Sequence, residues 1–270
     1  MFDATLYQEV TENFIKTHTK FIVNSFKNVL EWKSEGKEEI LDVGCGEGST
    51  TIHILEKMVM ENTKNYNILG IDLMDSMIDL AKKSFPNREN IQFKQADILD
   101  VNAWVGYKEH FHKVLSILCF MIVPNPKVWI KNIYNVLKPN GQIFFMLCLT
   151  NAMVKQQLYL SKQKKWETYQ KKNAMCSEFF INENSTDWII RHLEEGGFKH
   201  LIYNEIVFDT PLKNKEASYK FTKAFTLLNE TIPEELKEEY LNELCENIEK
   251  EYSKNKEYSK ISYLIISGRK

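Results

Sequence analysis

A strand-to-loop segment at residues 40–48 holds the residues whose types and spacing could do chemistry. Its sequence is Ile-Leu-Asp-Val-Gly-Cys-Gly-Glu-Gly, so one acidic residue, Asp42, precedes all of the glycines. A second carboxylate, Asp72, closes the next apolar run at residues 68–71. Glycine lets a backbone approach a ligand closely, and a carboxylate beyond the next strand can bind ribose hydroxyls. Together these features predict a nucleoside-type cofactor on an open α/β sheet.

Apolar strands and amphipathic helices alternate along the chain and are expected to position these carboxylates. Successive β–α units require a parallel sheet with helices on both faces. We therefore expect an α/β fold with a seven-stranded, mostly parallel, doubly wound sheet. The predicted strands are 40–43, 67–72, 91–96, 111–117, 142–148, 200–208 and 261–266. The predicted helices lie in the first 30 residues and at 49–61, 75–84, 126–137 and 185–195, with Asp75 as a helix cap and 138–141 as a turn.

Two long segments between predicted core elements do not belong to the sheet. Residues 151–182 and 211–257 have the pattern of amphipathic helices rich in aromatic residues. Extra helices on the carboxyl side of such a sheet usually form a lid over the ligand crevice. We expect one domain over residues 1–270, made of a cofactor-binding core at 33–148, helical cap elements at 1–32, 151–182 and 211–257, and core-completing segments at 185–210 and 258–270.

Composition and charge narrow the class of protein. The 270 residues are 43% hydrophobic and 27% charged, as in a soluble globular protein. No apolar run reaches the length of about 20 residues that spans a bilayer, and no secretory signal is visible after Met1. The five cysteines are scattered without metal-ligand spacing, so we expect reduced thiols, a cytoplasmic location and no metal. The net charge of −2 gives no general attraction to nucleic acid, and we expect a monomer or homodimer.

The glycine segment and three later landmarks resemble a known family. Residues 39–48 are similar to motif I of the class I S-adenosylmethionine-dependent methyltransferases. Asp72, residues 97–98 and residues 137–141 are similar to later landmarks of that superfamily and stand in the same order. The resemblance implies S-adenosyl-L-methionine as the cofactor and S-adenosyl-L-homocysteine as its product.

The same resemblance implies roles for individual residues. Asp42 and the glycines shape the loop that holds the methionine portion of the cofactor, and Asp72 accepts hydrogen bonds from the ribose. Leu73 lies against the adenine, and Asp97 accepts from the adenine amino group. Cys45 is expected to be a small residue in a crowded turn, not a nucleophile. The residues expected to bind the cofactor are Tyr7, Asp42, Gly44, Cys45, Gly46, Asp72, Leu73, Asp97, Ile98 and Ser116.

A closer resemblance covers nearly the whole chain. Segments throughout the sequence look like the insect juvenile hormone acid O-methyltransferases: residues 6–8, Ser116 with Cys119, and residues 164–166, 188–198 and 232–234. Those enzymes methylate the carboxylate of a long, apolar sesquiterpenoid acid. The resemblance therefore implies a small lipophilic acceptor, such as a terpenoid or fatty acid.

The chain departs from that family at two places. Phe14 stands where the family has a glutamine implicated in substrate handling. Met121 and Ile122 stand where the family usually has a His-Trp pair. Both departures remove hydrogen-bonding capacity near the expected reaction centre. They leave the cofactor prediction unchanged and make the acceptor the open question.

Methyl transfer asks little of side chains, because the sulfonium is already activated and the protein has to align the acceptor and exclude water. We therefore expect a positioning mechanism with no catalytic residue. His110 and His112 precede a strand at its amino end, away from the crevice. No other histidine closely follows a predicted core strand, and this favours an acceptor that is already ionised at neutral pH. An apolar acceptor pocket is expected from Phe14, Phe120, Met121, Ile122, Trp166, Phe179, Phe180 and Phe225.

Two alternatives to a lipophilic acid acceptor remain. The first is a methyltransferase that acts on another small molecule, a phenol or an amine. The second is a cofactor-binding protein with weak catalysis, which the lost polar positions keep open. A nucleic acid or protein acceptor is disfavoured by the near-neutral charge and by the Cys-Phe-Met-Ile sequence at 119–122, where an Asn-Pro-Pro-Tyr-type tetrapeptide is absent.

Overall fold

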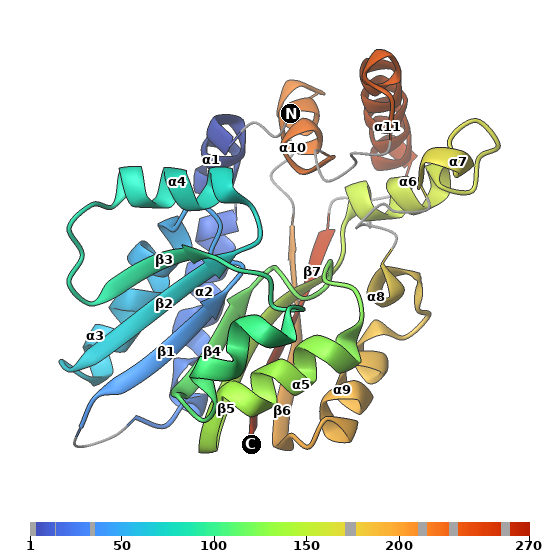
Figure 1. Ribbon diagram of the computed structural model, residues 1–270. Helices are drawn as coiled ribbons and strands as arrows, with labels where there is room; N and C mark the ends of the chain where they lie inside the picture. Colours follow the sequence, from blue (N-terminus) through green and yellow to red (C-terminus); the bar gives the residue numbers. More distant parts are fainter. Residues whose placement is uncertain are drawn as a thin grey trace.

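The structure is a computed structural model that describes residues 4–13, 15–32, 36–170, 177–209, 215–226, 232–254 and 260–270. Within these ranges the chain forms a seven-stranded sheet in the order β3-β2-β1-β4-β5-β7-β6 (Figure 1). Neighbouring strands are parallel except at β7, which runs antiparallel to β5 and β6. The strands are β1 (Glu38–Val43), β2 (Tyr66–Asp72), β3 (Ile91–Gln95), β4 (Phe111–Ile117), β5 (Leu137–Thr150), β6 (Lys199–Asp209) and β7 (Lys260–Arg269). The predicted fold class is confirmed.

The central strands are covered on both faces, which explains their nearly continuous apolar sequences. All of β4 is buried except Ile117, which is partly buried. The register places Asp42 of β1 beside Gly70 of β2 and beside Leu115 of β4. The strand order reverses between β1 and β4, and ligands of open α/β sheets bind outside the carboxyl ends of the strands at such a point. The glycine loop after β1 therefore lies at the expected ligand crevice.

Helices cover both faces of the sheet (Figure 1). The helices on one face are α5 (Pro126–Val136) and α9 (Ser185–Glu195), and on the other α2 (Ile15–Phe26) and α3 (Glu56–Asn62). A π-helical turn at Thr51–Leu55 precedes α3, α4 (Asp75–Ser84) packs beside β2 and β3, and 3-10 turns occupy Lys27–Val29 and Val101–Tyr107. In the described ranges, no helix combines the length and the apolar character needed to cross a membrane.

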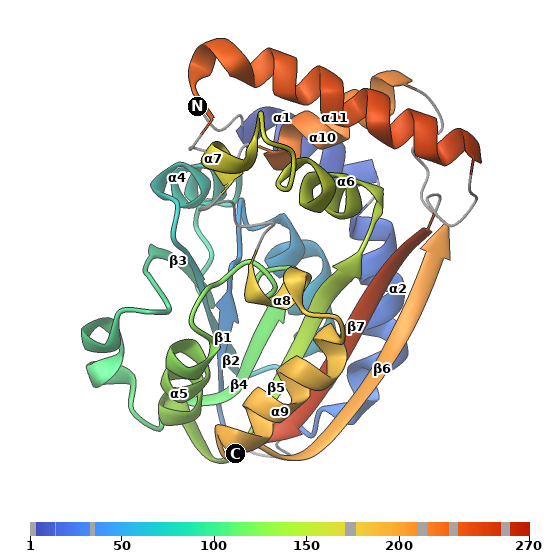
Figure 2. The same cartoon turned by 90° about the vertical axis from the view of Figure 1, so that its right-hand side faces the viewer.

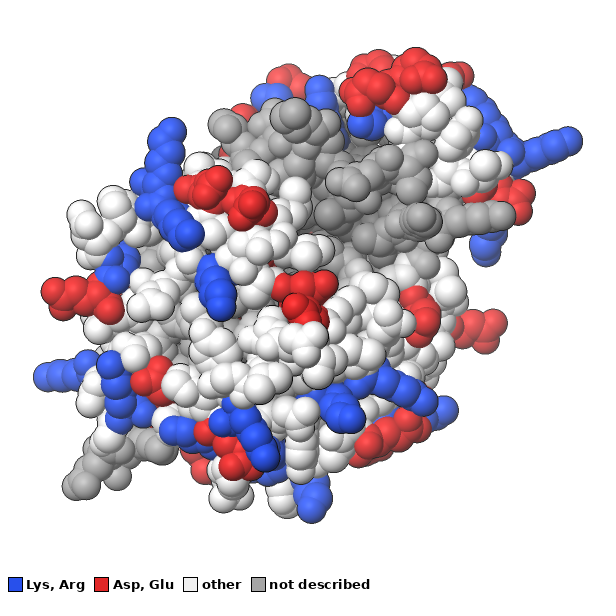
Figure 3. All heavy atoms as spheres, in the orientation of Figure 1, with Lys and Arg blue, Asp and Glu red and all other residues white. Residues whose placement is uncertain are grey.

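Further helices gather over the carboxyl edge of the sheet, where Figure 2 shows α1, α6, α7, α10 and α11 above the strand ends. They come from segments far apart in the sequence. The helices are α1 (Ala4–Asn13), α6 (Ala152–Leu160), α7 (Glu167–Gln170), α10 (Lys215–Thr226) and α11 (Glu234–Lys254), while α8 (Glu178–Ile181) leads back to α9. We call α1, α6, α7, α10 and α11 the lid. Figure 3 shows basic and acidic side chains interspersed over the face it draws.

One local prediction was wrong, and another gave the turn correctly but placed the start of the following strand too late. Asp75 does not cap α4: it is the first helical residue, Met74 precedes it, and no side chain caps this end. The turn predicted at 138–141 lies inside β5, which begins at Leu137. Asn140 turns the chain there with a φ of 64°, and a Cβ at Gly141 would lie 2.8 Å from the Lys138 carbonyl oxygen. The strand therefore starts earlier than its apolar run, because Asn140 turns the chain at a positive φ and Gly141 has no Cβ to clash with the Lys138 carbonyl.

Candidate functional site

The glycine loop packs closely against β2 and leaves one side open. The amides of Gly44 and Cys45 donate to the Ile71 carbonyl at 2.8 and 2.9 Å. Gly44 has a φ of +76°, and a Cβ there would lie 2.4 Å from the Cβ of Cys119. At Gly46, with a φ of +54°, an added Cβ would meet nothing within 4 Å. Glycine is thus required for packing at Gly44, while Gly46 presents bare backbone to open space, as a ligand cradle does.

Asp42 ties the loop to the helical segment that follows it. Its Oδ2 accepts a hydrogen bond of 2.6 Å from the Thr51 hydroxyl, and the side chain is buried. Burial raises the pKa of Asp42 to about 7, although the Thr51 hydrogen bond opposes the change. Asp42 therefore acts first as a buried structural group behind the loop.

Asp72 joins the glycine loop to the start of α4. Its Oδ2 accepts from the Gly46 amide at 3.0 Å, and its Oδ1 accepts from the Met74 amide at 2.9 Å. Burial raises the pKa of Asp72, while the backbone hydrogen bonds from Met74, Gly46 and Leu73 act in the opposite direction. Each carboxylate oxygen has a second lone pair, so the group can accept further hydrogen bonds from a ligand.

Asp97 and Ile98 lie at the next strand end. Asp97 Oδ1 accepts from the Leu99 amide at 2.8 Å, and the Asp97 carbonyl accepts from Trp104 Nε1 at 3.1 Å. The Ile98 carbonyl accepts from Asn132 Nδ2 at 2.8 Å. These bonds fix the chain after β3, where Asp97 lines the same cavity as Asp72.

A cavity of about 410 Å³ connects these strand ends with the lid. At one end it is lined by Gly44, Gly46, Asp72, Leu73, Asp97 and Ile98, all of which were predicted to hold the cofactor. At the other end it is lined by Met121, Ile122, Phe180 and Phe225, which were predicted for the acceptor pocket. The structure therefore brings both predicted groups of residues to one space. In the described part of the chain, no Lys, Arg or His lines this cavity.

A smaller cavity of about 40 Å³ lies on the other side of the glycine loop. It is lined by Asp42, Cys45 and Glu47 and by Thr11 and Lys16 of the amino-terminal helices. Lys16 donates to the Ser49 hydroxyl at 2.9 Å. Burial raises the pKa of Glu47, and the nearby Lys16 lowers it. This cavity adds a charged pair to the loop that carries the glycines.

Thr11 and Lys16 were not predicted from the sequence. The helical spacing of the amino-terminal segment was recognisable, but which side chains meet the loop depends on how α1 and α2 pack against it. Several residues of the acceptor end were not predicted either: Asn151, Met153, Val154, Phe221, Ala224, Ile261 and Tyr263. Their only sequence signal was their place in or beside the two segments expected to form the lid.

Among the predicted site residues that line neither cavity are Ser116, Phe120 and Trp166. The Ser116 hydroxyl donates to the Val43 carbonyl at 2.9 Å and so joins β4 to β1. Phe120 stacks on Trp129 with ring centroids 4.1 Å apart, beneath the loop after β4. Trp166 is buried, and its Nε1 donates to Glu243 of α11 at 2.9 Å, so it fixes the lid internally. All three have structural partners that account for their position.

Three other residues were predicted to belong to the site. Phe14 and the side chain of Tyr7 lie outside the described residues. Phe179, named with the apolar set, is buried and packs edge-on against Phe180 and Trp188.

Two histidines differ in their place relative to the cavity. His112 lies at the amino end of β4, where its Nδ1 accepts from the Glu39 amide at 2.9 Å, as expected for a structural residue. However, His18 of α2 lies beside the cavity wall, with its Nδ1 3.1 Å from the hydroxyl of Tyr263. Burial lowers the pKa of His18 and raises the pKa of Tyr263, so both are neutral at neutral pH. The sequence prediction concerned only histidines that closely follow a core strand and so did not cover His18, which reaches Tyr263 of β7 from the amino-terminal helix α2.

The thiols near the cavity are unreactive by their surroundings. Burial raises the pKa of Cys45 and of Cys119 well above the usual value and raises the pKa of Cys148 to about 12. A thiol that stays protonated is a poor nucleophile. This agrees with the prediction that Cys45 is a small residue in a tight turn.

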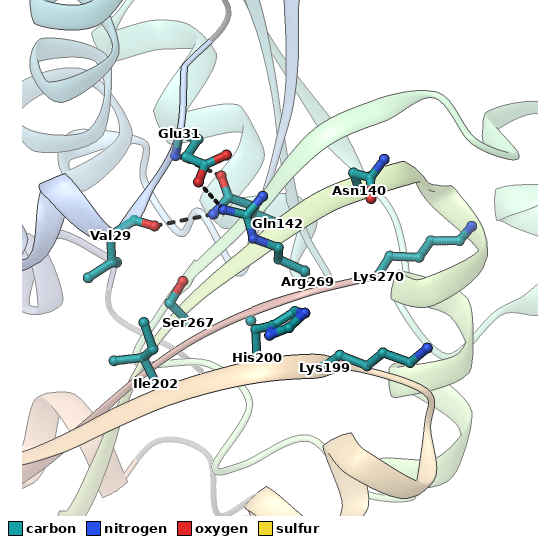
Figure 4. A pocket seen from close by; sticks show the side chains of 11 residues that line it. Val29, Glu31, Asn140, Gln142, Lys199, His200, Ile202, Ser267, Arg269 and Lys270 are labelled. Atoms are coloured by element: carbon teal, nitrogen blue, oxygen red, sulfur yellow. Dashed lines mark hydrogen bonds and ion pairs between the residues drawn. The ribbon is translucent and has the colours of Figure 1, made fainter.

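A larger groove lies at the opposite end of the sheet (Figure 4), with a volume of about 690 Å³. It is open to solvent, and some of its polar groups already bond to one another. Arg269 pairs with Glu31, and Gln142 donates to the Val29 carbonyl at 3.2 Å. It lies away from the glycine loop and both carboxylates. Size alone therefore does not make it the candidate site.

The arrangement of the sheet, the glycine loop and the two strand-end carboxylates defines the class I S-adenosylmethionine-dependent methyltransferase fold. A family model described as a methyltransferase domain matches residues 34–224, which is more than half of the chain. The chain therefore belongs to the methyltransferase domain family. Members of this class use S-adenosyl-L-methionine as methyl donor, in agreement with the predicted type of enzyme and cofactor.

Two individual relatives are similar to this chain over about two thirds of its length. It is 29% identical to juvenile hormone acid O-methyltransferase of Drosophila melanogaster over 171 residues, which are 63% of this chain and 56% of that protein. It is 24% identical to ubiquinone biosynthesis O-methyltransferase of Coxiella burnetii over 197 residues, 70% of this chain and 77% of that protein. The chain thus spans little more than half the length of the Drosophila relative.

A solved structure confirms the fold. Phosphoethanolamine N-methyltransferase 2 of Haemonchus contortus, in complex with S-adenosyl-L-methionine, superimposes with a TM-score of 0.59 at 14% identity. The match covers 99% of this chain and 56% of that one.

Proposed function

We propose that this chain binds S-adenosyl-L-methionine in the main cavity and transfers its methyl group to a small lipophilic acceptor, the carboxylate of a terpenoid or fatty acid. One observation carries the proposal. The strand-end carboxylates Asp72 and Asp97 and the apolar side chains of Met121 and Phe225 line a single cavity. A polar donor end and an apolar acceptor end in one space suit transfer between a nucleoside cofactor and a hydrocarbon-rich molecule.

The residues at the donor end fit the cofactor. Asp72 would accept from the ribose hydroxyls with the lone pairs that Gly46 and Met74 leave, and Asp97 would accept from the adenine amino group. The bare backbone at Gly46 lets the methionine portion approach the loop. When bound, the cofactor supplies a methyl group already activated on a sulfonium.

The residues at the acceptor end would hold hydrocarbon and exclude water. Met121 and Ile122 follow β4, and Phe180 and Phe225 approach from α8 and α10. A flexible, Met-containing apolar wall adapts to an unbranched or terpenoid chain. A carboxylate is already a nucleophile at neutral pH, so the chain needs to position it and not to deprotonate it.

The test is transfer of label. Purified protein is incubated with methyl-labelled S-adenosyl-L-methionine and a panel of farnesoid, fatty and aromatic acids, and we expect label in an ester that partitions into organic solvent. Transfer only to phenols or amines would contradict the carboxylate assignment. Calorimetry that detects binding of neither S-adenosyl-L-methionine nor S-adenosyl-L-homocysteine would overturn the proposal as a whole.

One observation favours a second candidate, an uncharged hydroxyl acceptor. The neutral His18–Tyr263 pair at the cavity wall could support a phenol, and the Coxiella burnetii relative is named for ubiquinone biosynthesis. Phenols in the same panel separate the two candidates.

A further inference from the structure

Gln157 of α6 is buried without a hydrogen-bond partner. Its exposed fraction is 0%, and neither Oε1 nor Nε2 has a partner within the described ranges. Folded proteins pair nearly all buried polar atoms, so an amide with both ends unpaired needs an explanation. Its neighbour Gln156 is also buried, but Gln156 has an interaction partner.

The position of Gln157 on α6 relates it to the cavity. Met153 and Val154 line the cavity, and Gln157 follows them by four and three residues. Residues at these spacings share one face of a helix, one turn apart. Gln157 therefore faces the same side as the two wall residues, about 9 Å further along α6 than Asn151 at the helix start. The cavity wall ends one turn before it.

The size of the cavity indicates where an acceptor would extend. A pocket for one drug-sized ligand measures about 300–1,000 Å³, and the cavity of about 410 Å³ is near the lower end of that range. A cavity of this size suits one small ligand, so an elongated acceptor bound beside the cofactor needs further space. The helix face that carries Met153 and Val154 continues to Gln157, so an acceptor that extended along this face would reach the amide.

The chemistry of the amide defines what it would bind. A primary amide offers a carbonyl acceptor and N–H donors side by side. A hydroxyl is the smallest uncharged group that can both donate to Oε1 and accept from Nε2. The other amide near this wall is already engaged, because Asn151 accepts from the Val154 amide at 3.0 Å and donates to Cys148 Sγ at 3.3 Å.

We propose that Gln157 is the acceptor-recognition residue of the lid and binds a hydroxyl on the acceptor, distant from the oxygen that is methylated. The inference rests on the proposed function, because it adds a second polar group to the same lipophilic acceptor. It assigns Gln157 to specificity and gives it no part in the methyl transfer step.

The first measurement is thermal stability without acceptor. Gln157→Met keeps the unbranched length and removes the unpaired amide, so we expect Tm to rise by about 2–4 °C. The matched control is Gln156→Met on the adjacent residue, for which we expect Tm to fall. A fall in Tm for Gln157→Met would mean that the amide has a structural partner, and would overturn the inference.

The second measurement is acceptor binding without chemistry. Protein loaded with S-adenosyl-L-homocysteine is titrated by calorimetry with dodecanoic acid and with 12-hydroxydodecanoic acid. We expect the unaltered protein to bind the hydroxy acid about tenfold more tightly, Gln157→Met to bind the two acids equally, and Gln156→Met to keep the preference. Equal affinities in the unaltered protein, or a preference that survives Gln157→Met, would overturn the inference.

The two proposals fail separately in this design. Methyl transfer to both acids with no effect of Gln157→Met on preference overturns the inference and leaves the proposed function. A preference that depends on Gln157, in a protein that transfers no methyl group to these acids or to any other acid of the panel, overturns the proposed function and leaves the recognition role. Binding of neither acid, in a protein that esterifies other acids of the panel, overturns the inference alone.

Discussion

The two ends of the main cavity are built in different ways. The donor end is made of consecutive strand ends, β1 to β3, and its ligand groups are held by hydrogen bonds to backbone, as at Asp72 and Asp97. The acceptor end is made of side chains from the loop after β4, from α6, α8 and α10, and from β7. A site held by backbone geometry tolerates few substitutions. Substitutions in a wall of apolar side chains from separate segments can instead change which ligand binds. We therefore expect the fold to determine the methyl donor and the side chains of the acceptor end to determine the acceptor.

Because backbone geometry holds the donor end together, we expect a substitution in the glycine loop to have the largest effect on stability. Gly44→Ala places a methyl group against Cys119 at a positive φ, so we expect the free energy of unfolding to fall by about 3 kcal/mol. Chemical denaturation measures it. Gly46→Ala is the control, because its Cβ meets open space and only the backbone strain remains. Equal losses in the two variants would show that close packing does not distinguish these positions.

Asp72→Ala tests the donor end by itself. It removes the acceptor for the Gly46 and Met74 amides and the proposed partner of the ribose, so we expect affinity for S-adenosyl-L-homocysteine to fall by about 1–3 kcal/mol. Calorimetry measures the affinity. Asp75→Ala serves as control, since Asp75 is a nearby carboxylate outside the cavity lining. Unchanged affinity in Asp72→Ala would remove this residue from the cofactor site.

Because Asp42 is buried behind the glycine loop of the donor end, we expect the stability of the protein to depend on pH. Its pKa rises from an ordinary 3.8 to about 7 on folding, so between these pH values the folded chain retains a proton that the unfolded chain has released. The stabilisation that protonated Asp42 contributes to the folded state is fully present below about pH 4 and is lost as the pH rises toward 7. We expect the unaltered protein to lose up to about 1.4 kcal/mol per pH unit relative to Asp42→Asn across this window. Parallel stability curves for the two proteins would contradict the assignment.

Tyr263→Phe tests the acceptor end and has the smallest expected effect. It removes the hydroxyl that pairs with His18, so we expect about 1 kcal/mol of lost stability, an altered acceptor KM and an unchanged cofactor Kd. Tyr66→Phe is the matched control, because it removes a buried hydroxyl bonded to Glu56 away from the cavity. If Tyr263→Phe weakened cofactor binding as much as acceptor binding, the division of the cavity into two ends would fail.

The two ends also differed in how far the sequence predicted them. The donor end depends on residues close to strand ends, where local pattern and strand order suffice, and Asp42, Gly46, Asp72 and Asp97 all lie at the cavities as expected. Ser116 was the exception, because the direction of a strand-end side chain is set by the sheet pleat, which a short apolar run does not reveal.

The acceptor end depends on long-range packing. Met121, Ile122, Phe180 and Phe225 were predicted and line the cavity, whereas Phe120 and Trp166 were predicted and pack elsewhere. An aromatic residue that fills a core and one that lines a pocket look alike in sequence, because the same hydrophobic effect favours burial of both. Tyr263 and its partner His18 are separated by most of the chain and had no local signal.

The place of β7 in the sheet has a consequence for when the cavity can form during synthesis. The strands and loops of the donor end are complete once the chain has been synthesised to the end of β4 at Ile117. Ile261 and Tyr263, which complete the acceptor wall, lie on β7, which inserts between β5 and β6. Because a domain generally folds as a unit, we expect neither end of the cavity to form until β7 has been synthesised. A chain that ended before residue 260 would thus contain every residue of the donor end and still lack part of the acceptor wall.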